Sequence, residues 1–524
     1  MNLFSLEFVT LLIVLLLAFY LLPKRFQWIC LLAASILFYA FSGPINLLFI
    51  GITSFSTWGA GVLFSRFRQE YERLRKEGSP DKEQRKVLKA QYARRKRILM
   101  WAVVVLNFGI LTFVKYIPAF STLGLLFPLG ISFYTFQAIG YLMDQYNEKY
   151  EPEQNYLRYL LFIAFFPQLI QGPINRFDKL KESLLSEHSF RWEQIKRALF
   201  MILFGLMKKY AIANLLAGAI AYILDAPTAA TTGSSIVMAI LMYSAQQYAD
   251  FSGGIDLVLG IALLFGVEMM PNFRQPYFAV SLADFWRRWH ISLGAWMKDY
   301  VFFPFALTKP MQKFGKWGNN KFGREIGRVL PGSIGNILVF FLVGIWHGAR
   351  MHYIVWGLYN GVIISLTELI PPIFHALKPR KEVVSEEIPP SAFRQRCRYV
   401  LSIVITFVIV NIGWYFDRIE KMSDCMLCFR NTVMNFNPSS IPALLSEMSL
   451  QIDSFSFAGL GIVGFATLLV LVHSIMSERH IDVFDFLQRH NIVIRWGVYY
   501  LLLILIQVSM SMANGSEAFI YAVF

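Results

Sequence analysis

Long apolar segments and short polar segments alternate along the whole chain. Each apolar segment approaches or exceeds the ~20 residues that an α-helix needs to cross a bilayer. The recurrence predicts an all-α, polytopic membrane bundle of roughly 11–13 membrane helices, some of them re-entrant or broken. The apolar segments lie near residues 3–22, 28–42, 44–64, 98–117, 120–143, 156–171, 198–224, 234–266, 330–346, 353–370, 399–416, 457–476 and 496–513.

The composition supports a membrane protein and argues against a soluble one. Hydrophobic residues make up 56% of the 524 residues and aromatic residues 16%, and the mean hydropathy is +0.49. Soluble domains rarely reach such values. The first segment, 2–22, has no basic stretch before it and no small-residue cleavage site after it. We therefore expect a retained helix there rather than a signal peptide.

The net charge of +15 is distributed as a topology signal and not as a nucleic-acid surface. Basic residues are concentrated between apolar segments, with thirteen Lys and Arg in 66–97 and further blocks in 308–328 and 375–398. Loops rich in Lys and Arg stay in the cytoplasm and contact anionic lipid. We expect these three segments to be cytoplasmic and the uncharged loop 225–233 to be external, with no nucleic acid as partner.

The segments between two basic loops predict a break in one helix. Three apolar segments separate the loops 66–97 and 172–197, whereas two loops on the same side require an even number of crossings. One segment must then be re-entrant or broken, either 127–141 or 160–173, both of which contain Pro and Gly. Irregular backbone at membrane depth survives where it is buried in protein or lines a cavity. The chain should therefore enclose a polar cavity.

Polar residues within apolar segments are candidates for lining that cavity. The stretch 243–260 places Gln246, Gln247 and Asp250 among apolar neighbours. Interhelical hydrogen bonds that hold the bundle together are an equally good explanation for any one of them. Asp250 is the costliest of the three in a membrane, and so is the one that we most expect to face a cavity.

The segment 284–300 has the pattern of an amphipathic helix at the membrane interface. Trp286 and Trp289 begin an aromatic series that recurs at three- and four-residue spacing, while basic residues occupy the rest of the helix. A plain membrane anchor would show the same pattern. His290 lies beside the aromatic face, and an imidazole in that position suggests a further role.

His347 is the strongest candidate for chemistry. It lies in the motif GIWHGA, 344–349, at the end of an apolar helix. Burial keeps an imidazole neutral, which is the form that a general base needs to take a proton from a hydroxyl attacking an activated acyl group. A histidine that only packs between helices is the alternative. His347 and His352 are five residues apart, off the spacing that puts two metal ligands on one helix face, so we expect no metal site.

Cys425 and Cys428 have the spacing of a metal or redox pair, but no second pair of ligands lies nearby to complete a metal site. If this segment is external, a disulfide between the two cysteines is the alternative.

Several motifs in order resemble the membrane-bound O-acyltransferase family, most closely its bacterial branch of alginate O-acetylation and D-alanyl-transferring proteins. They are QQYADFSGGIDLVLGIALLFG (246–266), QPYFAVSLADFWRRWHISLGAWMKDYVFFP (275–304), GIWHGARMHYIVWGLYNG (344–361) and GSEAFIYAVF (515–524). The resemblance implies a helical bundle around a funnel or tunnel. It matches His347 to the near-invariant family histidine, which is expected to be the catalytic base. It matches His290 to the second characteristic histidine, which is expected among the catalytic residues but for tunnel structure or donor handling rather than as the base. Residues expected to line the tunnel or bind substrate are Asp250, Gln246, Gln247, Trp286, Trp289, Trp346 and Asn360.

The resemblance also implies an activity, partners and a domain order. It implies acyl transfer, with acetyl expected, from a cytoplasmic thioester donor (acetyl-CoA or acyl-carrier phosphopantetheine) to a cell-surface or secreted polysaccharide. It implies an extracytoplasmic SGNH-type partner, the bacterial inner membrane and no bound cofactor. Arg274, Asn360 and the Arg-Met-His after GIWHGA depart from the usual pattern and leave the acceptor open. The expected domains are N-terminal membrane helices (1–117), a catalytic core (118–372), a basic cytoplasmic loop (373–398) and C-terminal membrane helices with an external loop at 417–456 (399–524).

Three alternatives have different observable consequences. D-alanyl transfer to teichoic acid would use the same chemistry with a different acyl group. A transporter or channel would be built from inverted repeats with charged residues near the midplane of both halves, and the sequence shows neither feature. A scaffold that recruits other envelope enzymes would stay active with both histidines replaced.

Overall fold

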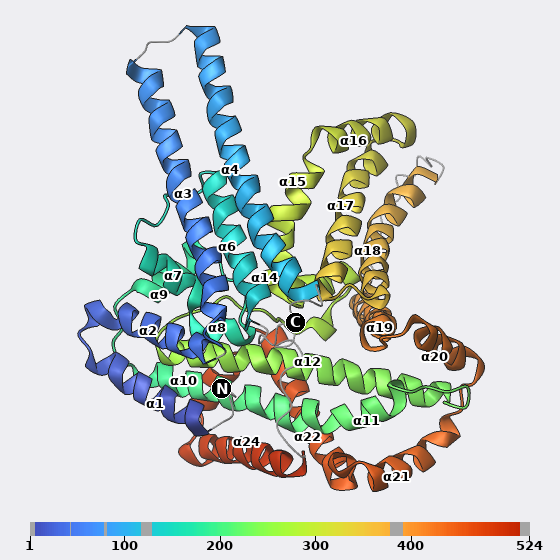
Figure 1. Ribbon diagram of the computed structural model, residues 1–524. Coiled ribbons are helices and arrows are strands. Elements are labelled where there is room, and N and C mark those ends of the chain that lie inside the picture. The colour runs from blue at the N-terminus through green and yellow to red at the C-terminus, as the bar shows by residue number, and fades with distance from the viewer. Residues whose placement is uncertain (1–5, 42, 78–80, 117–127, 378–390, 514–524) are drawn as a thin grey trace. The chain divides into compact units, whose positions relative to one another are not determined.

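The fold is all-α, as the apolar pattern predicts (Figure 1). The computed structural model describes residues 6–41, 43–77, 81–116, 128–377 and 391–513. Over these ranges the regular structure is helical, and the one isolated β-bridge joins Phe273 and Trp289. The terminal motif 515–524 and residues 378–390 of the expected basic loop 373–398 lie outside the described residues, and the described ends of that loop continue α18 and begin α19.

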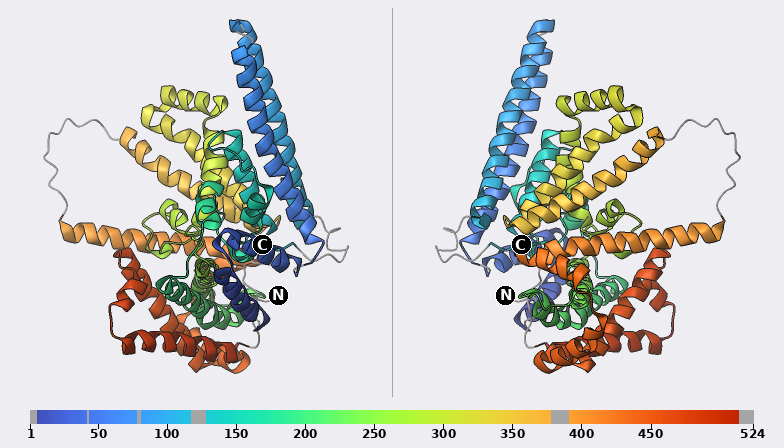
Figure 2. Two further views of the ribbon diagram at one scale, coloured as in Figure 1. Left: turned by 90° about the vertical axis from the view of Figure 1, so that its left-hand side faces the viewer. Right: turned by 90° about the vertical axis from the view of Figure 1, so that its right-hand side faces the viewer.

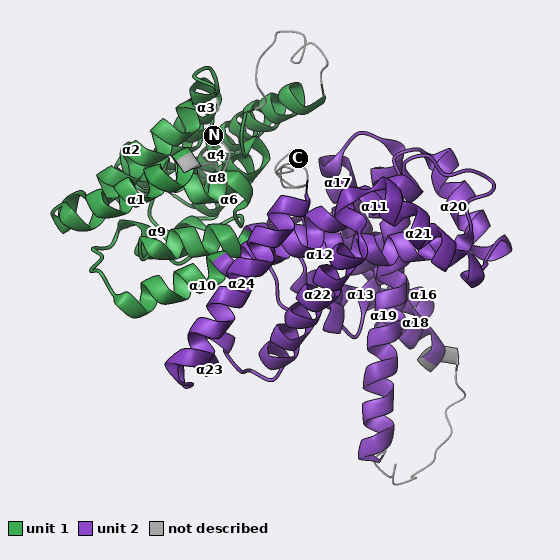
Figure 3. Cartoon of the chain, turned by 90° about the horizontal axis from the view of Figure 1, so that it is seen from below, with its two compact units in different colours: residues 1–202, 255–270, 521–524 green, residues 203–254, 271–520 purple. Residues whose placement is uncertain are grey.

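The helices form two compact units, coloured separately in Figure 3. The first unit consists of residues within 1–202 and 255–270. Its helices, the last of which continues a few residues beyond the unit, are α1 (Leu6–Leu21), η1 (Lys24–Phe26), α2 (Gln27–Ala40), α3 (Asn46–Glu77), α4 (Lys82–Tyr116), α6 (Ile131–Tyr146), α7 (Tyr156–Ala164), α8 (Phe166–Gln171), α9 (Phe177–Leu185) and α10 (Trp192–Lys208).

The second unit consists of residues within 203–254 and 271–520 and contains both candidate histidines. Of its helices, α12 has its last turns in the first unit. They are η2 (Lys209–Asn214), α11 (Leu215–Leu224), α12 (Gly233–Leu264), η3 (Pro276–Phe278), α13 (Leu282–Arg288), α14 (Ile291–Met297), η4 (Lys298–Phe302), α15 (Phe303–Ala306), α16 (Lys309–Phe322), α17 (Arg324–His347), α18 (Met351–Leu377), α19 (Ala392–Arg418), α20 (Met422–Met434), η5 (Pro438–Ser440), α21 (Ile441–Gln451), η6 (Asp453–Phe455), α22 (Phe457–Glu478), α23 (Val483–Gln488) and α24 (Ile492–Met512).

The helices confirm a multi-pass membrane protein. Eight helical stretches of the described part are long and apolar enough to cross a bilayer. Several of the thirteen apolar segments form helices shorter than a full crossing, among them α1, α2 and α6. The eight stretches are α3, α4, α10 continued through η2 and α11, α17, α18, α19, α22 and α24.

The predicted break in an apolar segment is confirmed at 160–173. The segment forms two short helices, α7 and α8, which are separated by an extended Phe165 (φ −53°, ψ 112°), and Pro167 lies in the first turn of α8. The Gln168 side chain donates a hydrogen bond to the carbonyl of Phe162, and Gln137 Nε2 donates to Gln168 Oε1 at 2.9 Å. These side chains satisfy backbone and amide groups that the break exposes, and the segment is buried within its unit.

The basic segment 66–97 is largely helical rather than a loop. In Figures 1 and 2 the helices α3 and α4 extend side by side well beyond their apolar parts. An ion pair between Arg95 and Glu70 (3.2 Å) joins the two extensions. Long basic and acidic side chains have high helix propensity, so a segment that is too polar to enter the bilayer still continues the two helices.

The segments 225–233 and 417–456, both predicted to be external, lie against each other. The second of these is also helical, forming α20 and α21. The amide of Asn431 in α20 donates to the carbonyls of Thr228 (3.0 Å) and Thr231 (2.9 Å). Cys425 and Cys428 in α20 are both free and buried. Burial raises the pKa of Cys425 to about 12 and that of Cys428 to about 11, so both thiols stay protonated.

Candidate active site

The prediction of one continuous helix over 284–300 is wrong, and the break in it creates the site. Helix α13 ends at Arg288, Trp289 is extended (φ −104°, ψ 128°), and α14 begins after His290. His290 has a left-handed backbone conformation with φ +50°. A non-glycine residue in that region costs roughly 1–3 kcal/mol and persists where the surrounding structure enforces it. Here the strain falls on a candidate catalytic residue.

A second chain segment enforces this conformation. Residues 272–275 run antiparallel to 288–291, with a backbone bond from the Arg274 N–H to the Arg288 carbonyl (2.9 Å). A further bond runs from the Ile291 N–H to the Asn272 carbonyl (3.0 Å). The first turn of α13 is fixed independently, because Ser281 Oγ accepts from the Asp284 N–H at 3.1 Å. His290 therefore follows a capped helix and lies within a short two-stranded pairing, and the two together fix its backbone.

The Asn272 side chain orients the imidazole of His290. Its Oδ1 accepts from the Ser292 N–H (3.0 Å) and Oγ (2.8 Å), which identifies this atom as the oxygen of the amide. His290 Nδ1 lies 3.3 Å from the same oxygen and must therefore carry the proton. In that tautomer Nε2 carries the lone pair. Burial lowers the pKa of His290 to about 3, so the ring is neutral at physiological pH.

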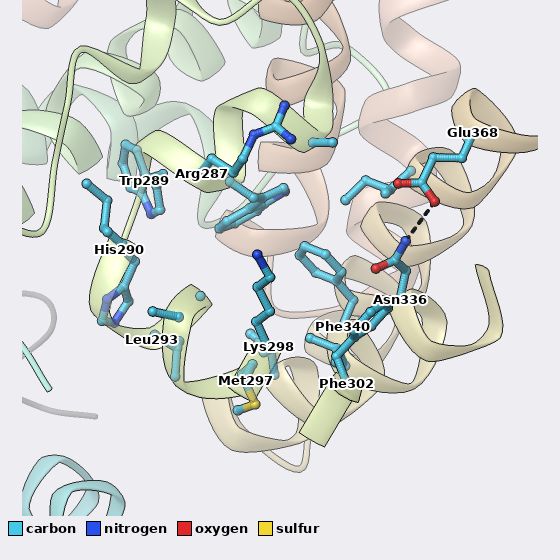
Figure 4. Close-up of a pocket in the computed structure, with 18 residues that line it drawn as sticks. Arg287, Trp289, His290, Leu293, Met297, Lys298, Phe302, Asn336, Phe340 and Glu368 are labelled. Atoms are coloured by element: carbon cyan, nitrogen blue, oxygen red, sulfur yellow. Dashed lines mark hydrogen bonds between the residues drawn. The ribbon is translucent and has the colours of Figure 1, made fainter. Parts of the chain in front are cut away.

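His290 lines a cavity of about 440 Å³ (Figure 4). The walls come from α13, α14, α17 and α18 and are mainly apolar, with Trp286, Trp289 and Leu293 beside the histidine. This volume lies within the ~300–1,000 Å³ of small-molecule sites. An apolar chamber of this size that contains a neutral imidazole is suited to hold an acyl thioester away from water.

The opposite end of the cavity is polar. Asn336 and Glu368 line it, and Asn336 Nδ2 donates to Glu368 Oε2 at 3.1 Å. Lys298 lies between His290 and Asn336 in Figure 4, and Arg287 also belongs to the lining. Figure 4 shows His290 and Glu368 at opposite sides of the chamber. Four lining residues of α17, from Asn336 to Val343, repeat at the spacing of one helix face. The chamber therefore runs along α17, and its polar residues lie toward the beginning of that helix.

His347 lies behind an aromatic layer rather than on the cavity wall. Its ring centroid is 4.9 Å from those of Trp346 and Trp356, and 5.7 Å from that of Tyr353. The Trp346 ring also lies 6.3 Å from that of His290, so one tryptophan contacts both imidazoles. His347 is buried and does not line the 440 Å³ cavity. Its role as general base stays a prediction.

Asn360 supports the cavity wall without lining the cavity. Its Oδ1 accepts from the indole N–H of Trp286 at 3.0 Å, and its Nδ2 donates to the Trp356 carbonyl at 2.9 Å. Each end of the buried amide is thus engaged, and Trp286 is held against the chamber. Of the expected lining residues, the structure brings Trp286, Trp289 and His290 together on the wall and places Trp346 and Asn360 directly behind it.

The polar residues of α12 lie elsewhere in the second unit. Asp250 and Lys209 form a buried ion pair with Nζ and Oδ1 2.6 Å apart, and Gln246 and Gln247 are buried on the same helix as Asp250. None of the three α12 side chains lines the cavity. Lys209 begins a π-helical turn, and the neighbouring Lys208 donates to Ser252 Oγ at 2.8 Å. These contacts fit the alternative explanation, in which the polar residues of α12 hold the helices together and do not line the cavity.

Sequence reasoning missed Asn272, Lys298 and Glu368. Glu368 could have been found, because an ionisable residue within an apolar spanning segment indicates a functional site. Lys298 was assigned only to the polar side of an assumed continuous helix. Asn272 lies 18 residues before His290 and carries no signal of its own until the chain pairing is known.

Comparisons with known proteins identify the family. Residues 152–410 match the sequence model of MBOAT, the membrane-bound O-acyltransferase family. The chain is 30% identical to the probable alginate O-acetylase AlgI of Pseudomonas aeruginosa, over 77% of this chain and 69% of the relative. The chain belongs to the membrane-bound O-acyltransferase family. It is also 30% identical to the peptidoglycan O-acetyltransferase of Helicobacter pylori (68% of each chain) and to the teichoic acid D-alanyltransferase of Bacillus subtilis (55% of this chain, 67% of the relative).

Membership makes the protein a multi-pass membrane acyltransferase and removes the transporter or channel alternative. The matched region contains both histidines and every residue of the cavity wall. Among the described residues no three His, Cys, Asp or Glu side chains meet in an arrangement that could hold a metal ion.

Proposed function

We propose that this protein transfers an acyl group from a thioester to the hydroxyl of a cell-envelope polysaccharide. The observation that carries the proposal is a chamber with mainly apolar walls and polar residues at one end, next to a neutral imidazole oriented by an amide. The names of the three relatives describe enzymes that acylate alginate, peptidoglycan or teichoic acid. That common feature supports an envelope polymer as the acceptor.

In this proposal the base is His290, which lines the cavity, and not His347, to which the sequence pattern assigns that role. The chemical step follows from the tautomer of His290. The acceptor oxygen attacks the thioester carbonyl while Nε2 of His290 takes the hydroxyl proton. The C–S bond then breaks, the acyl group remains on oxygen, and the imidazolium returns the proton to the thiolate. The products are an ester and a thiol, so the ring is neutral again and no other reactant is consumed. A cavity that excludes water prevents hydrolysis of the thioester.

The donor enters from the cytoplasm in this proposal. The polar end of the chamber lies toward the start of α17 and the later part of α18. In sequence these helix ends adjoin the basic segments 308–328 and 375–398, which the positive-inside rule places in the cytoplasm. Acetyl-CoA and an acylated carrier phosphopantetheine are the two donors available on that side. The membrane is then the bacterial inner membrane.

The acceptor side is supported by the relatives alone. An acetyl group handed to an extracytoplasmic SGNH-type protein, or directly to the polysaccharide, is the first form of the proposal. D-alanyl transfer is the second form, supported by the teichoic acid D-alanyltransferase relative. Mass analysis of envelope polysaccharides from cells with and without the gene distinguishes the two, because acetyl and D-alanyl esters differ in mass.

A purified-protein assay tests the role of the cavity. The protein in nanodiscs is given acetyl-CoA labelled on the acetyl group, and release of thiol and transfer of label to an oligosaccharide are followed. His290→Gln removes the base and should lower the rate roughly 10²–10⁴-fold. The exposed variant Lys313→Gln on α16 serves as the control. Full activity of His290→Gln would refute the proposed step.

A further inference from the structure

We propose that the basic extension of α3 and α4 is a docking site for an acidic soluble protein. The extension consists of residues 66–77 of α3 and 82–97 of α4. Thirteen Lys and Arg fall within 66–97 against five Asp and Glu, so the extension carries a strong positive charge. The inference goes beyond acyl transfer, because this surface belongs to the first unit and contains none of the residues that line the His290 cavity.

The base of the extension is rigid. The buried ammonium of Lys96 forms an ion pair with Glu148 at 2.5 Å. It also lies 5.9 Å from the centre of the Phe64 ring and 5.1 Å from that of Tyr92. The Tyr92 ring in turn stacks on that of Tyr71 across the two helices, with their centres 5.2 Å apart. The outer residues are therefore held in a fixed arrangement, and little entropy is lost when a partner binds them.

Four exposed cations in the outer part of the extension form no ion pair with any residue that the structure describes. Cations nearer the base are neutralised, as Arg95 is by Glu70 at 3.2 Å. An excess of like charge repels itself and destabilises the folded chain. A partner that supplies carboxylates removes this repulsion. The four residues, called the tip cations below, are Arg75, Lys76, Lys82 and Lys89.

The tip cations lie beyond the lipid headgroups. The apolar part of α3 ends before Arg66 and that of α4 begins at Ile98, and each tip cation lies at least nine residues away, or about 13 Å at 1.5 Å per residue. Headgroups extend only about 5–8 Å from the hydrocarbon core, and charge interactions in physiological salt decay over about 8 Å. Figure 2 shows α3 and α4 side by side to their outer ends. A soluble partner reaches all four cations, whereas headgroups reach only the base.

The other exposed residues of the extension favour a protein over a nucleic acid. Glu72, Glu77 and Glu83 are exposed and interrupt the basic residues. A nucleic-acid backbone carries closely spaced phosphates along its whole length and would meet these carboxylates, whereas a protein can place single carboxylates opposite single cations. Leu74 and Val87 are 39% and 54% exposed and offer apolar contacts to a protein surface. The partner is therefore an acidic protein surface that also contains apolar side chains.

A binding assay on the full-length protein tests the docking site. The protein is placed in nanodiscs of uncharged phosphatidylcholine. Three labelled probes are compared, which are an acidic peptide of Glu, Ala and Leu, a single-stranded oligonucleotide of equal charge, and vesicles of phosphatidylglycerol. Arg75→Gln/Lys82→Gln/Lys89→Gln should weaken binding of the peptide about tenfold, the combined effect of three exposed charge pairs, and should reduce its salt dependence.

The matched control removes three exposed cations from the start of α19. Arg394→Gln/Arg396→Gln/Arg398→Gln should bind the peptide as wild type does. Equal weakening by the two triple variants would show non-specific attraction and overturn the proposal. A loss by the first variant that is confined to the oligonucleotide or to the vesicles would assign the extension to nucleic acid or to lipid instead. Thermal unfolding shows that the first variant is folded, because its loss of repulsion should leave the unfolding temperature unchanged or higher.

Crosslinking in cells tests for the partner itself. A photoreactive amino acid replaces Gln91, which is exposed on the α4 extension. The expected result is a crosslink to a protein of net negative charge, identified by mass spectrometry, that disappears when the three cations of the first variant are also replaced. A crosslink that persists without those cations, or that forms with lipid or nucleic acid alone, would overturn the proposal. Neither readout depends on acyl transfer, so failure of the proposed function leaves this test intact.

Discussion

The oxygen of Asn272 lies 3.3 Å from Nδ1 of His290 and fixes which nitrogen of the ring faces the reaction. The same oxygen also receives both the backbone and the side-chain donor of Ser292. One amide thereby sets the rotation of the imidazole, its tautomer and the start of α14. Replacing it should change the acid–base behaviour of the site as well as its stability.

Asn272→Asp should move the activity to higher pH. A carboxylate at 3.3 Å from Nδ1 favours the imidazolium and so raises the pKa of His290. The neutral base is then lost at higher pH than in wild type, and an acidic limb appears in the pH–rate profile. Asn272→Ala should lower the rate without creating that limb. Identical profiles for wild type and Asn272→Asp would show that the amide does not control the ring.

Wild-type activity should show no titration of His290 between pH 5 and 8. Burial holds its pKa at about 3, so the base is neutral throughout that range. The pH dependence of the free energy of unfolding has the opposite sign from that of a histidine whose pKa is raised by an acidic partner. The unfolded chain, with an ordinary pKa near 6.5, binds a proton that the folded protein refuses, so the free energy of unfolding falls as pH drops below about 6.5.

The measurement compares thermal unfolding of wild type and His290→Gln from pH 8 to pH 4 in one detergent. Below pH 6.5, wild type should lose stability faster than the variant, by up to ~1.4 kcal/mol per pH unit. Parallel curves for the two proteins would mean that His290 is accessible to protons in the folded state.

His347→Ala tests the role that the sequence pattern assigns to this residue. The variant should lose envelope acylation while retaining expression and membrane insertion, because the imidazole ends α17 beside the Trp346 ring that also contacts His290. Acylation of the polysaccharide is measured by mass analysis and insertion by membrane fractionation. Normal acylation would limit His347 to packing.

Breaking the ion pair between Lys209 and Asp250 should destabilise the protein without altering donor preference. Removing one partner of a fully buried pair leaves an uncompensated charge and costs ~3–5 kcal/mol. Asp250→Asn should therefore lower the unfolding temperature in detergent, whereas Lys209→Met combined with Asp250→Leu should recover part of the loss. A stable but inactive Asp250→Asn would instead place Asp250 in substrate handling.

The native cysteines provide a topology test. Cys397 is exposed in α19 next to a basic segment, whereas Cys425 and Cys428 are buried. A membrane-impermeant maleimide should label Cys397 in inverted vesicles and not in intact spheroplasts. A Cys397→Ser variant controls for labelling at Cys30. Labelling from the outside would reverse the proposed direction of donor entry.

The sequence predicts the bundle well because the bilayer imposes a strong rule on helix length and polarity. The break at Phe165 was equally accessible, since Pro167 and the parity of the basic loops point to it. The break at His290 could not be predicted from the sequence in the same way. The tryptophans continue at helical spacing across it, and the contacts that interrupt the helix come from Asn272, outside the segment.

Contacts between distant segments also explain why the sequence predicts the candidate site only in part. Both histidines follow from the motifs, but which of them borders a cavity depends on how α13 and α14 meet α17 and α18. The residues expected from their polarity, above all Asp250, form contacts within the bundle instead. The sequence does not single out Arg287 and Lys298 as cavity-lining residues, because Arg and Lys near a membrane interface are ordinary topology signals.

Arg288 links the helix before His290 to Glu478 at the end of α22. Glu478 lies far beyond residue 410, where the match to the family ends, and it is not among the residues that line the His290 cavity. A chain shortened to the matched region would retain both imidazoles and every wall residue yet lose the anchor of α13. Helix α22 thus braces the helix that precedes His290, and we expect a shortened chain to lose order at α13.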